Sequence, residues 1–288
     1  MTKIVLGTAQ FSGKYGLNNK KKIKIDEIKK ITNFAKLKKI KSIDTAPNYF
    51  NLYQIYPILN KFSICSKIPT ISKIKIKDLE KFLNDLVDDI LIKYKKKKLN
   101  SLIFHDTNDF RDKRRMKLAL KFLIRLKKKR KIGEIGASIY TLRDFKSFMK
   151  LAKNIKIDLI QIPINLLDRS FLNKNFQNKI KKNKIKIQAR SIFLQGLLLE
   201  SKRHKFFKRW DKNFEIWDTQ NISSKILFCY DFVKNQNFVD EIIIGFNSYD
   251  EIKFFFKSIS IKPKMNYLKI IGEQKNKILI NPSNWNLR

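Results

Sequence analysis

The sequence predicts a single (β/α)₈ barrel, in which eight parallel strands close into a TIM barrel surrounded by helices. Short apolar runs alternate with longer amphipathic stretches along the whole chain, and there are eight such units. This alternation requires parallel strands covered by helices, and eight units close naturally into a barrel. No Pro/Gly/Ser-rich linker divides the 288 residues. We therefore expect one domain over residues 1–288, with a C-terminal extension from about residue 258.

Eight short apolar runs are the predicted strands. They cover residues 4–8, 42–45, 62–67, 101–105, 134–138, 159–163, 185–190 and 241–246. Between them, apolar residues recur at helical spacing, as over residues 28–40 and 79–90. An open doubly wound sheet is the rival architecture, and it needs a Gly-rich phosphate-binding turn after an early strand. The turn at residues 7–10, Gly-Thr-Ala-Gln, lacks that spacing, which favours the barrel.

The net charge is strongly positive, because 64 Lys and Arg residues face 25 Asp and Glu residues and leave +39. Such a balance is typical of proteins that bind nucleic acid or an anionic surface. The excess is mostly Lys, spread along the whole chain, with many Ile and Asn, a pattern also expected from an AT-rich genome. Both interpretations stay open. With no aromatic-interleaved basic motif in the chain, we expect no specific nucleic-acid partner.

Cysteine content and hydropathy bear on the compartment. The two cysteines, Cys65 and Cys229, are too few and too far apart for a disulfide framework, and we expect no bound metal. The N-terminal apolar run is too short for a signal peptide, and no window approaches the roughly 18 apolar residues that span a bilayer. We expect a cytoplasmic protein without membrane insertion, acting as a monomer or weak dimer on a small molecule.

Four polar side chains follow three neighbouring predicted strands at their carboxyl ends, where barrel enzymes place their chemistry. Asp44 ends the second strand, with Tyr49 in its loop, and Lys67 and His105 end the third and fourth. Because neighbouring strands lie about 4.8 Å apart, Asp44 and Lys67 can touch. A Lys beside a phenol lowers its pKa, which makes the phenol a usable proton donor, and a His can hold the substrate oxygen beside it.

Each of these residues taken alone also has a structural interpretation. Asp44 could cap the following turn, and Lys67 is one lysine among many. His105 could be a hydrogen-bonded structural residue, and Tyr49 could pack in its loop. The prediction of a catalytic site therefore depends on their joint placement.

These segments resemble the aldo-keto reductase family over residues 6–252. Residues 43–49 are similar to the family's Ile-Asp-Thr-Ala-x-x-Tyr motif, Ser66-Lys67 to its Thr-Lys, and residues 102–105 to its strand that ends in the catalytic His. Residues 135–138, 160–167, 188–198 and 243–246 resemble its later motifs in the same order. The opening Leu-Gly-Thr-Ala-Gln-Phe is similar to a bacterial branch of the family that is often associated with surface-polysaccharide or sugar metabolism.

The resemblance implies an oxidoreductase that uses NADPH or NADH to reduce the carbonyl of an aldehyde, ketone or sugar-like substrate. The catalytic group would be Asp44, Tyr49, Lys67 and His105, with Tyr49 as the proton donor. Ser138 and Gln161 would hold the nicotinamide carboxamide, and Arg190 would occupy the position that usually stacks on the nicotinamide ring. The rest of the cofactor would lie along Gly7, Thr8, Ser191, Leu194, Gly245, Asn247 and Ser248.

Three departures from the family pattern concern the site. Ile139 replaces an Asn, which removes one carboxamide hydrogen bond of about 0.5–1.5 kcal/mol, and Phe50 replaces the Gly that commonly follows the catalytic Tyr. Residues 247–252 lack the Arg that often grips the 2′-phosphate of NADPH. Glu251 in that segment would repel the phosphate or accept a ribose hydroxyl. We therefore expect a weaker preference for NADPH than the family norm.

Two other functions fit parts of the sequence. A barrel of this kind can bind a nucleotide as a sensor or regulatory subunit without useful turnover, although the complete catalytic group argues against it. The charge by itself suits a polyanion-binding protein. Measurable turnover of a carbonyl substrate would distinguish the enzyme from the sensor. Nucleic-acid binding that survives physiological salt would favour the polyanion-binding protein.

Overall fold

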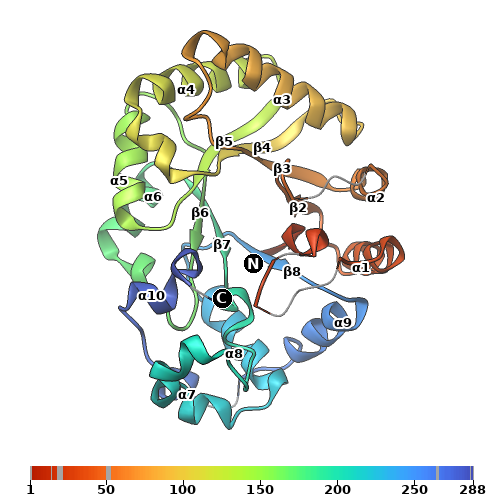
Figure 1. Cartoon of the computed structure of the whole chain (residues 1–288), viewed down its shortest axis with the longest axis vertical. Helices are drawn as coiled ribbons and strands as arrows, with labels where there is room; N and C mark the ends of the chain where they lie inside the picture. The colour runs from red at the N-terminus through yellow and green to blue at the C-terminus, as the bar shows by residue number, and fades with distance from the viewer. Residues whose placement is uncertain are drawn as a thin grey trace.

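The computed structural model describes residues 2–13, 15–17, 22–49, 53–263, 266–285 and 287. Eight parallel strands close into one barrel, in which each strand pairs with its neighbours in the chain and the last pairs with the first (Figure 1). The strands are β1 (Lys3–Gly7), β2 (Ser42–Asp44), β3 (Ser63–Ile68), β4 (Leu99–Phe104), β5 (Ile132–Ser138), β6 (Leu159–Pro163), β7 (Lys186–Arg190) and β8 (Glu241–Gly245). The predicted (β/α)₈ barrel is confirmed.

The strand limits differ slightly from those that the apolar runs predict. β4 and β5 each begin two residues earlier than expected, and His105 lies just beyond the end of β4. The reason is that strand limits follow the hydrogen bonds to neighbouring strands, whereas the sequence pattern reports burial. His105 still continues the ladder locally, because its N–H donates to the Ile68 carbonyl oxygen at 3.2 Å.

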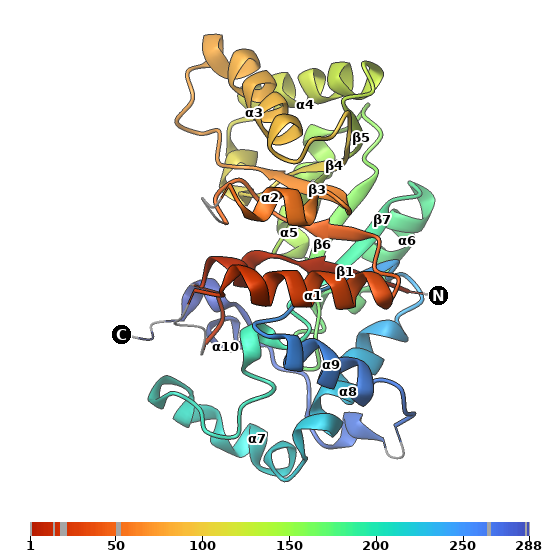
Figure 2. The same ribbon diagram turned by 90° about the vertical axis from the view of Figure 1, so that its right-hand side faces the viewer.

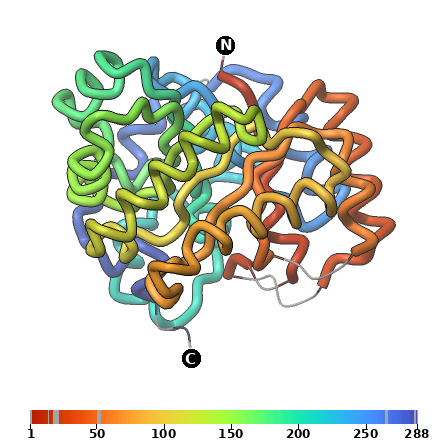
Figure 3. The backbone as a smooth tube through the Cα atoms, turned by 90° about the horizontal axis from the view of Figure 1, so that it is seen from above, coloured from red at the N-terminus to blue at the C-terminus, as the bar shows by residue number. Residues whose placement is uncertain are grey.

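Helices cover the outside of the barrel. They are α1 (Ile25–Leu37), α2 (Ile55–Leu59), α3 (Leu79–Lys93), α4 (Lys113–Lys128), α5 (Leu142–Leu151), α6 (Lys174–Lys182), α7 (Asp211–Asp218), α8 (Ile222–Lys234), α9 (Tyr249–Ser258) and α10 (Lys277–Ile280). Figure 2 shows α3, α2, α1 and α9 following one another around one side of the barrel, and Figure 3 looks onto α3 and α4 from above. The connection between β7 and β8 contains both α7 and α8, and it is the longest connection between two strands of the barrel.

Local signals set the beginnings of two helices near the carboxyl end of the barrel. At α5, the Thr141 hydroxyl accepts from the Asp144 N–H, and the Asp144 carboxylate accepts from the Thr141 N–H, which is a capping box. At α9, the Ser248 hydroxyl oxygen accepts from the Glu251 N–H at 3.1 Å. These caps set the residues at which α5 and α9 begin.

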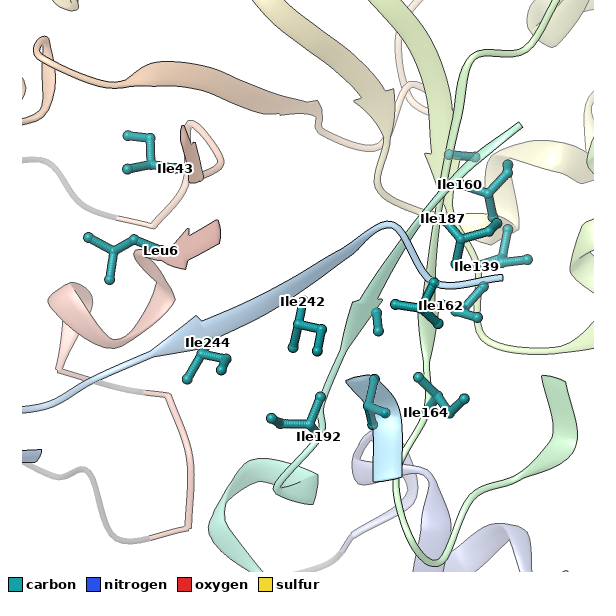
Figure 4. Close-up of a cluster of buried hydrophobic side chains, with 14 of the residues drawn as sticks. Leu6, Ile43, Ile139, Ile160, Ile162, Ile164, Ile187, Ile192, Ile242 and Ile244 are labelled. Atoms are coloured by element: carbon teal, nitrogen blue, oxygen red, sulfur yellow. The ribbon is translucent and has the colours of Figure 1, made fainter. Parts of the chain in front are cut away.

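The main hydrophobic core lies between the outward faces of the strands and the helices. Figure 4 shows part of it, with side chains from several strands on the same side of the sheet. Leu6, Ile43 and Ile242 are fully buried there, and Ile244 is 2% exposed. Each such side chain contributes roughly 1.5–3 kcal/mol on burial. Because these residues alternate along each strand, the residues between them point into the barrel.

The interior of the barrel carries polar side chains. Gln161 lies between Ile160 and Ile162 on β6, so the pleat turns it inward, and the same holds for Gln188 on β7. Both glutamine residues are at most 1% exposed to solvent. Barrels of this type are usually filled by branched apolar residues. The buried polar groups therefore need hydrogen-bond partners inside the barrel.

Gly136 on β5 packs against β6 too closely for any side chain. A Cβ at this position would lie 1.9 Å from the Leu159 carbonyl oxygen. We expect Gly136→Ala to lower the free energy of unfolding by at least about 2 kcal/mol, because that oxygen belongs to a paired strand and cannot move away. Urea unfolding measures this, with Gly272→Ala as the control, since no atom lies within 4 Å of the Cβ built there. Equal stability of the two variants would contradict the described packing.

The segment after α9 packs against the loop that follows β6. The Gln274 N–H donates to the Leu167 carbonyl oxygen at 2.8 Å, and Arg169 Nη2 donates to the Ile271 carbonyl oxygen at 3.0 Å. We infer that this segment is an extension of the one barrel domain. No helix in the described part of the chain is both long enough and apolar enough to cross a membrane.

Candidate active site

A cavity of about 690 Å³ opens at the carboxyl end of the barrel. Every strand contributes a residue at or near its carboxyl end: Gly7, Asp44, Lys67, His105, Ser138, Gln161, Arg190 and Gly245. The volume falls within the range of roughly 300–1,000 Å³ that is typical of small-molecule sites. The four residues predicted as catalytic line this cavity together with most of the residues predicted to bind a cofactor.

Lys67 and Asp44 form a buried ion pair in the floor of the cavity. Lys67 Nζ lies 2.5 Å from Asp44 Oδ2 and also donates to the Thr45 carbonyl oxygen at 3.2 Å. The side chains of Lys67 and Asp44 are only 3% and 8% exposed. Burial alone would lower the pKa of Lys67, but the Asp44 carboxylate beside it raises that pKa above its usual value overall. Lys67 therefore carries its positive charge throughout the physiological pH range.

Tyr49 lies above this ion pair, in the loop after β2. Lys67 Nζ is 5.1 Å from the centroid of the Tyr49 ring. Burial raises the pKa of Tyr49, and the Lys67 charge opposes this rise only in part. Lys67 does lower the pKa of Tyr49, as expected from the sequence. Burial has the larger effect, so the net shift of this pKa is upward, because the cavity removes the phenol from water. The phenol is protonated at neutral pH, which is the form that can donate a proton.

His105 stands beside Tyr49 in the cavity. The two rings meet edge to face, with centroids 6.2 Å apart and an interplanar angle of 77°. Burial, reinforced by the Lys67 charge, lowers the pKa of His105 to about 4. The sequence left open whether this imidazole is neutral or charged. In the structure it is neutral above about pH 5, so it carries one N–H that can donate to an oxygen.

Ser138 and Arg190 lie together at the ends of β5 and β7. Arg190 Nε donates to the Ser138 hydroxyl oxygen at 3.2 Å, and Nη2 donates to the Ile139 carbonyl oxygen at 3.0 Å. The guanidinium carbon lies 4.3 Å from the centroid of the Tyr140 ring. Tyr140 therefore covers part of the guanidinium, while the Ser138 hydroxyl keeps its own proton for a further acceptor. The Ile139 side chain, where the family usually has Asn, is fully buried in the core.

Gln161 joins the ion pair to the centre of the barrel. Its Nε2 donates to Asp44 Oδ1 at 2.6 Å and to Gln188 Oε1 at 2.8 Å. Its Oε1 is buried and has no hydrogen-bond partner among the described residues. Buried acceptors without a partner are rare, and this one belongs to a residue that lines the cavity. A bound molecule with an N–H group would complete it.

The turn after β7 has an unusual backbone. Ser191, Leu194 and Gln195 have φ values of 60°, 46° and 54°, in the left-handed region that costs non-glycine residues about 1–3 kcal/mol each. Ser191 and Gln195 line the cavity. Turns with left-handed residues can present successive N–H groups to an anion. The expected role of this turn in holding the pyrophosphate of a cofactor stays a proposal.

The far end of the cavity lies at the start of α9. Asn247 and Glu251 both line it, and the Glu251 carboxylate accepts from the Asn247 N–H at 2.7 Å and from Asn247 Nδ2 at 3.1 Å. A carboxylate is thus held at this end of the cavity, in the segment that the family resemblance predicts to lie along the cofactor. Phe50, the other departure from the family pattern in the loops of the site, lies outside the described residues.

Three of the predicted cofactor-binding residues do not line the cavity. The Thr8 hydroxyl donates to the Asp44 carbonyl oxygen at 3.0 Å, the Leu194 side chain is fully buried in the core, and Ser248 caps α9. Their side chains support the elements that surround the cavity. The motif spacing placed them near the site, but it does not report the direction of a side chain in a loop.

Tyr15 and Tyr140 also line the cavity, although neither residue was predicted from the sequence to have a role there. Burial raises the pKa of Tyr15, and the Arg190 charge opposes it. The signal for Tyr15 was its position four residues after the opening Leu-Gly-Thr-Ala-Gln-Phe segment, which resembles a bacterial branch of the family. For Tyr140 the signal was its position directly after the Ser138-Ile139 pair.

The described residues contain no group of three or more His, Cys, Asp and Glu side chains that is placed to hold a metal ion. Cys65 lies near Asp44, and burial, with a further contribution from that carboxylate, raises the pKa of its thiol to about 12. Cys65 is therefore a neutral thiol in the barrel interior at physiological pH. The chemistry available in the cavity is that of a phenol, a neutral imidazole and a Lys–Asp ion pair.

The fold and this group of residues define a class, namely barrel enzymes that carry acid–base groups around a cofactor-sized cavity. A model described as "Aldo/keto reductase family" matches residues 3–270. The chain belongs to the aldo/keto reductase family, and this membership places it among oxidoreductases that generally use NAD(P)H.

Solved structures of known proteins share this fold. The chain is similar to the glycerol dehydrogenase from Gluconobacter oxydans, with 17% identity, a TM-score of 0.63, and coverage of 92% of this chain and 88% of that one. It is also similar to the holo form of an aldo-keto reductase from Bacillus halodurans, with 16% identity, a TM-score of 0.68, and coverage of 91% and 88%. No curated protein sequence matches the chain.

Proposed function

We propose that this protein reduces the carbonyl of a small aldehyde, ketone or sugar-like substrate with NADPH or NADH, and that Tyr49 donates the proton. The observation that carries the proposal is the joint position of Tyr49, His105 and the Lys67–Asp44 pair in one cavity. The unpartnered Gln161 Oε1 supports the fit of the cofactor, because the carboxamide N–H of a nicotinamide would give this oxygen a hydrogen-bond partner. Ser138 and Arg190 would lie beside that carboxamide and ring.

In the proposed reaction a bound nicotinamide supplies the hydride that the carbonyl carbon accepts. Tyr49 Oη gives its proton to the carbonyl oxygen, so that the product is an alcohol. The Lys67 charge stabilises the phenolate that remains, and Asp44 holds Lys67 in place. Neutral His105 donates its N–H to the substrate oxygen and orients it toward Tyr49.

The test is to mix the protein with NADPH and with NADH and to follow cofactor fluorescence and oxidation in the presence of aldehydes, ketones and sugars. Cofactor binding with turnover of at least one substrate class is expected. Binding without turnover of any of them would favour a nucleotide sensor. Absence of binding together with tight nucleic-acid binding at physiological salt would favour a polyanion-binding protein, since nonspecific attraction to phosphates fades steeply with salt.

The cofactor preference follows from the carboxylate at the far end of the cavity. We expect the ratio of the NADH and NADPH dissociation constants to stay below about 100, which corresponds to about 2.7 kcal/mol. The reason is that Glu251 lines the cavity and, at the proposed adenosine site, would repel a 2′-phosphate. The measurement is a titration of both cofactors at low and at physiological salt, since exposed charges more than about 10 Å away are screened at 0.1 M.

Two variants sharpen this prediction. Glu251→Gln keeps an oxygen acceptor for the Asn247 N–H but loses the charge, so it should raise the preference for NADPH by about fivefold, the Coulomb effect of one charge at about 4 Å in water. Asp250→Asn is the matched control, because Asp250 lies on the same helix turn outside the cavity lining. An NADPH preference above a hundredfold that persists with salt would show that another cation grips the phosphate.

The cellular setting is proposed from the sequence. We infer a cytoplasmic protein that works as a monomer or weak dimer on a small-molecule substrate. Sedimentation velocity at several concentrations measures the oligomeric state, and a stable tetramer at micromolar concentration would contradict this part of the proposal.

A further inference from the structure

Basic turns surround the amino end of the barrel, on the side opposite the cavity. The helices run antiparallel to the strands, so the turns from a helix to the next strand lie at this end, which is the side where N is marked in Figure 2. Four of these turns form the basic rim, and each holds three or four Lys or Arg and no Asp or Glu: residues 38–41, 95–98, 128–131 and 181–184. Two of them are neighbours, because the Leu99 N–H donates to the Lys131 carbonyl oxygen at 2.9 Å.

In each turn of the rim the residue with a left-handed backbone is a cation. Lys39, Lys95, Arg130 and Lys184 have φ values of 59°, 49°, 57° and 51°. Gly or Asn usually takes this conformation after a helix. An AT-rich genome accounts for the loss of Gly, but it supplies Asn as readily as Lys, and this chain is rich in Asn. The helix dipole favours a cation at each helix C-terminus, but one charge in the last turn is enough for that effect.

The opposite end of the barrel shows that composition alone does not produce the rim, because a compositional bias acts on both ends equally. At the carboxyl end, residues 45–54 carry no charge, and residues 106–112 hold three Asp and one Arg. Where lysines occur at that end, as at residues 73–77, Ile separates them and Asp78 follows. The basic rim therefore reflects position in the fold as well as composition.

The charge of the rim is largely unneutralised. Among the described residues, Lys131 alone in the rim forms an ion pair, with Asp88 at 2.5 Å. The Asp158 carboxylate, which also lies at this end, is paired with Lys127 at 2.6 Å. Apart from Lys131 and the half-buried Lys96, the cations of the rim are exposed. Such a cluster attracts a polyanion.

Two exposed aliphatic side chains stand beside the rim. Leu37, in the last turn of α1, is 77% exposed, and Ile92, in the last turn of α3, is 75% exposed. Cations together with exposed aliphatic side chains suit the surface of an anionic bilayer, where headgroups meet acyl chains. Single-stranded nucleic acid instead needs aromatic rings for stacking. The rim contains none, and the neighbouring Tyr94 is only 3% exposed.

We propose that the basic rim, with Leu37 and Ile92, attaches this protein peripherally to a bilayer that contains anionic phospholipids. The rim surrounds the closed end of the barrel, so a flat surface can meet several of its turns together. The cavity then faces away from the bilayer and stays open to small molecules. This attachment lies at the membrane surface and requires no helix that crosses it.

Vesicle sedimentation with the full chain tests this inference. Vesicles of phosphatidylcholine alone are compared with vesicles that contain about 30% phosphatidylglycerol, at about 0.15 M salt. Binding to the anionic vesicles should be at least about tenfold tighter. The variant Lys95→Gln/Lys97→Gln/Lys129→Gln/Arg130→Gln should weaken it at least about tenfold, since each cation near an anionic surface contributes about fivefold in affinity.

A matched control removes the same charge elsewhere. Lys73→Gln/Lys75→Gln/Lys77→Gln/Lys212→Gln changes four exposed lysines outside the rim, and its affinity should stay within about threefold of the original. All eight substituted side chains in the two variants are exposed, so both proteins should fold, which circular dichroism checks.

A second variant tests the apolar contribution without changing any charge. Leu37→Ser/Ile92→Ser should weaken binding to the anionic vesicles at least about threefold, because two aliphatic side chains no longer leave water. Its affinity for a single-stranded uridine 20-mer should not change.

Three results would overturn the inference. The first is an equal loss in both four-residue variants, which would assign the attraction to overall net charge. The second is the absence of binding to the anionic vesicles. The third is tighter binding of the uridine 20-mer at the same salt, lost in the rim variant, which would assign the rim to nucleic acid.

Discussion

Replacing Tyr49 by Phe should lower turnover by about 10²- to 10⁴-fold, the usual contribution of a general acid, while cofactor binding changes little. The substitution removes only the hydroxyl group, so the ring still packs against the core and faces Lys67 and His105. Steady-state kinetics with the substrate found in the screen measure the first effect. Cofactor fluorescence titration measures the second.

Two further phenols serve as controls for this result. Tyr15 lines the same cavity, so Tyr15→Phe tests whether it, and not Tyr49, supplies the proton. Tyr53 is 76% exposed and lies outside the cavity lining, so Tyr53→Phe should behave like the unmodified protein. If Tyr49→Phe keeps more than about a tenth of the turnover, the assignment of Tyr49 as the general acid is wrong. A larger loss in Tyr15→Phe would move the role to that residue.

Lys67→Met should abolish most activity and also destabilise the fold. The substitution leaves the Asp44 carboxylate buried without its cation, and breaking a buried ion pair in this way costs about 3–5 kcal/mol. In any remaining activity the basic limb of the pH profile should shift upward, because the Lys67 charge lowers the pKa of Tyr49 and its loss raises it. Urea unfolding and a pH–rate profile measure the two effects.

A double variant separates the two consequences of losing Lys67. In Asp44→Asn/Lys67→Met no uncompensated charge remains in the barrel, so stability should return toward that of the unmodified protein. Activity should stay low, because the positive charge beside Tyr49 is still absent. An active double variant, or a Lys67→Met protein with an unchanged pH profile, would show that the lysine has only a structural role.

Much of the fold was predictable because its determinants are local. Each strand is a short apolar run and each helix has its own apolar stripe, so eight β-α units could be recognised without knowledge of any contact. Closure into a barrel then follows from the parallel arrangement, and the carboxyl ends of β2, β3 and β4 necessarily meet at one face. Asp44, Lys67 and His105 could be predicted as neighbours for this reason.

The tertiary structure alone decided what these neighbours do to one another. The net upward shift of the Tyr49 pKa depends on how far the closed cavity removes the phenol from water, which no local pattern reports. The Gln161–Asp44 hydrogen bond joins residues 117 positions apart, and the Gln188–Glu241 bond joins residues 53 positions apart. The sequence by itself determined the barrel and placed the carboxyl ends of its strands to within about one residue. Burial, charge pairing across the interior and side-chain direction arose only when distant strands came together.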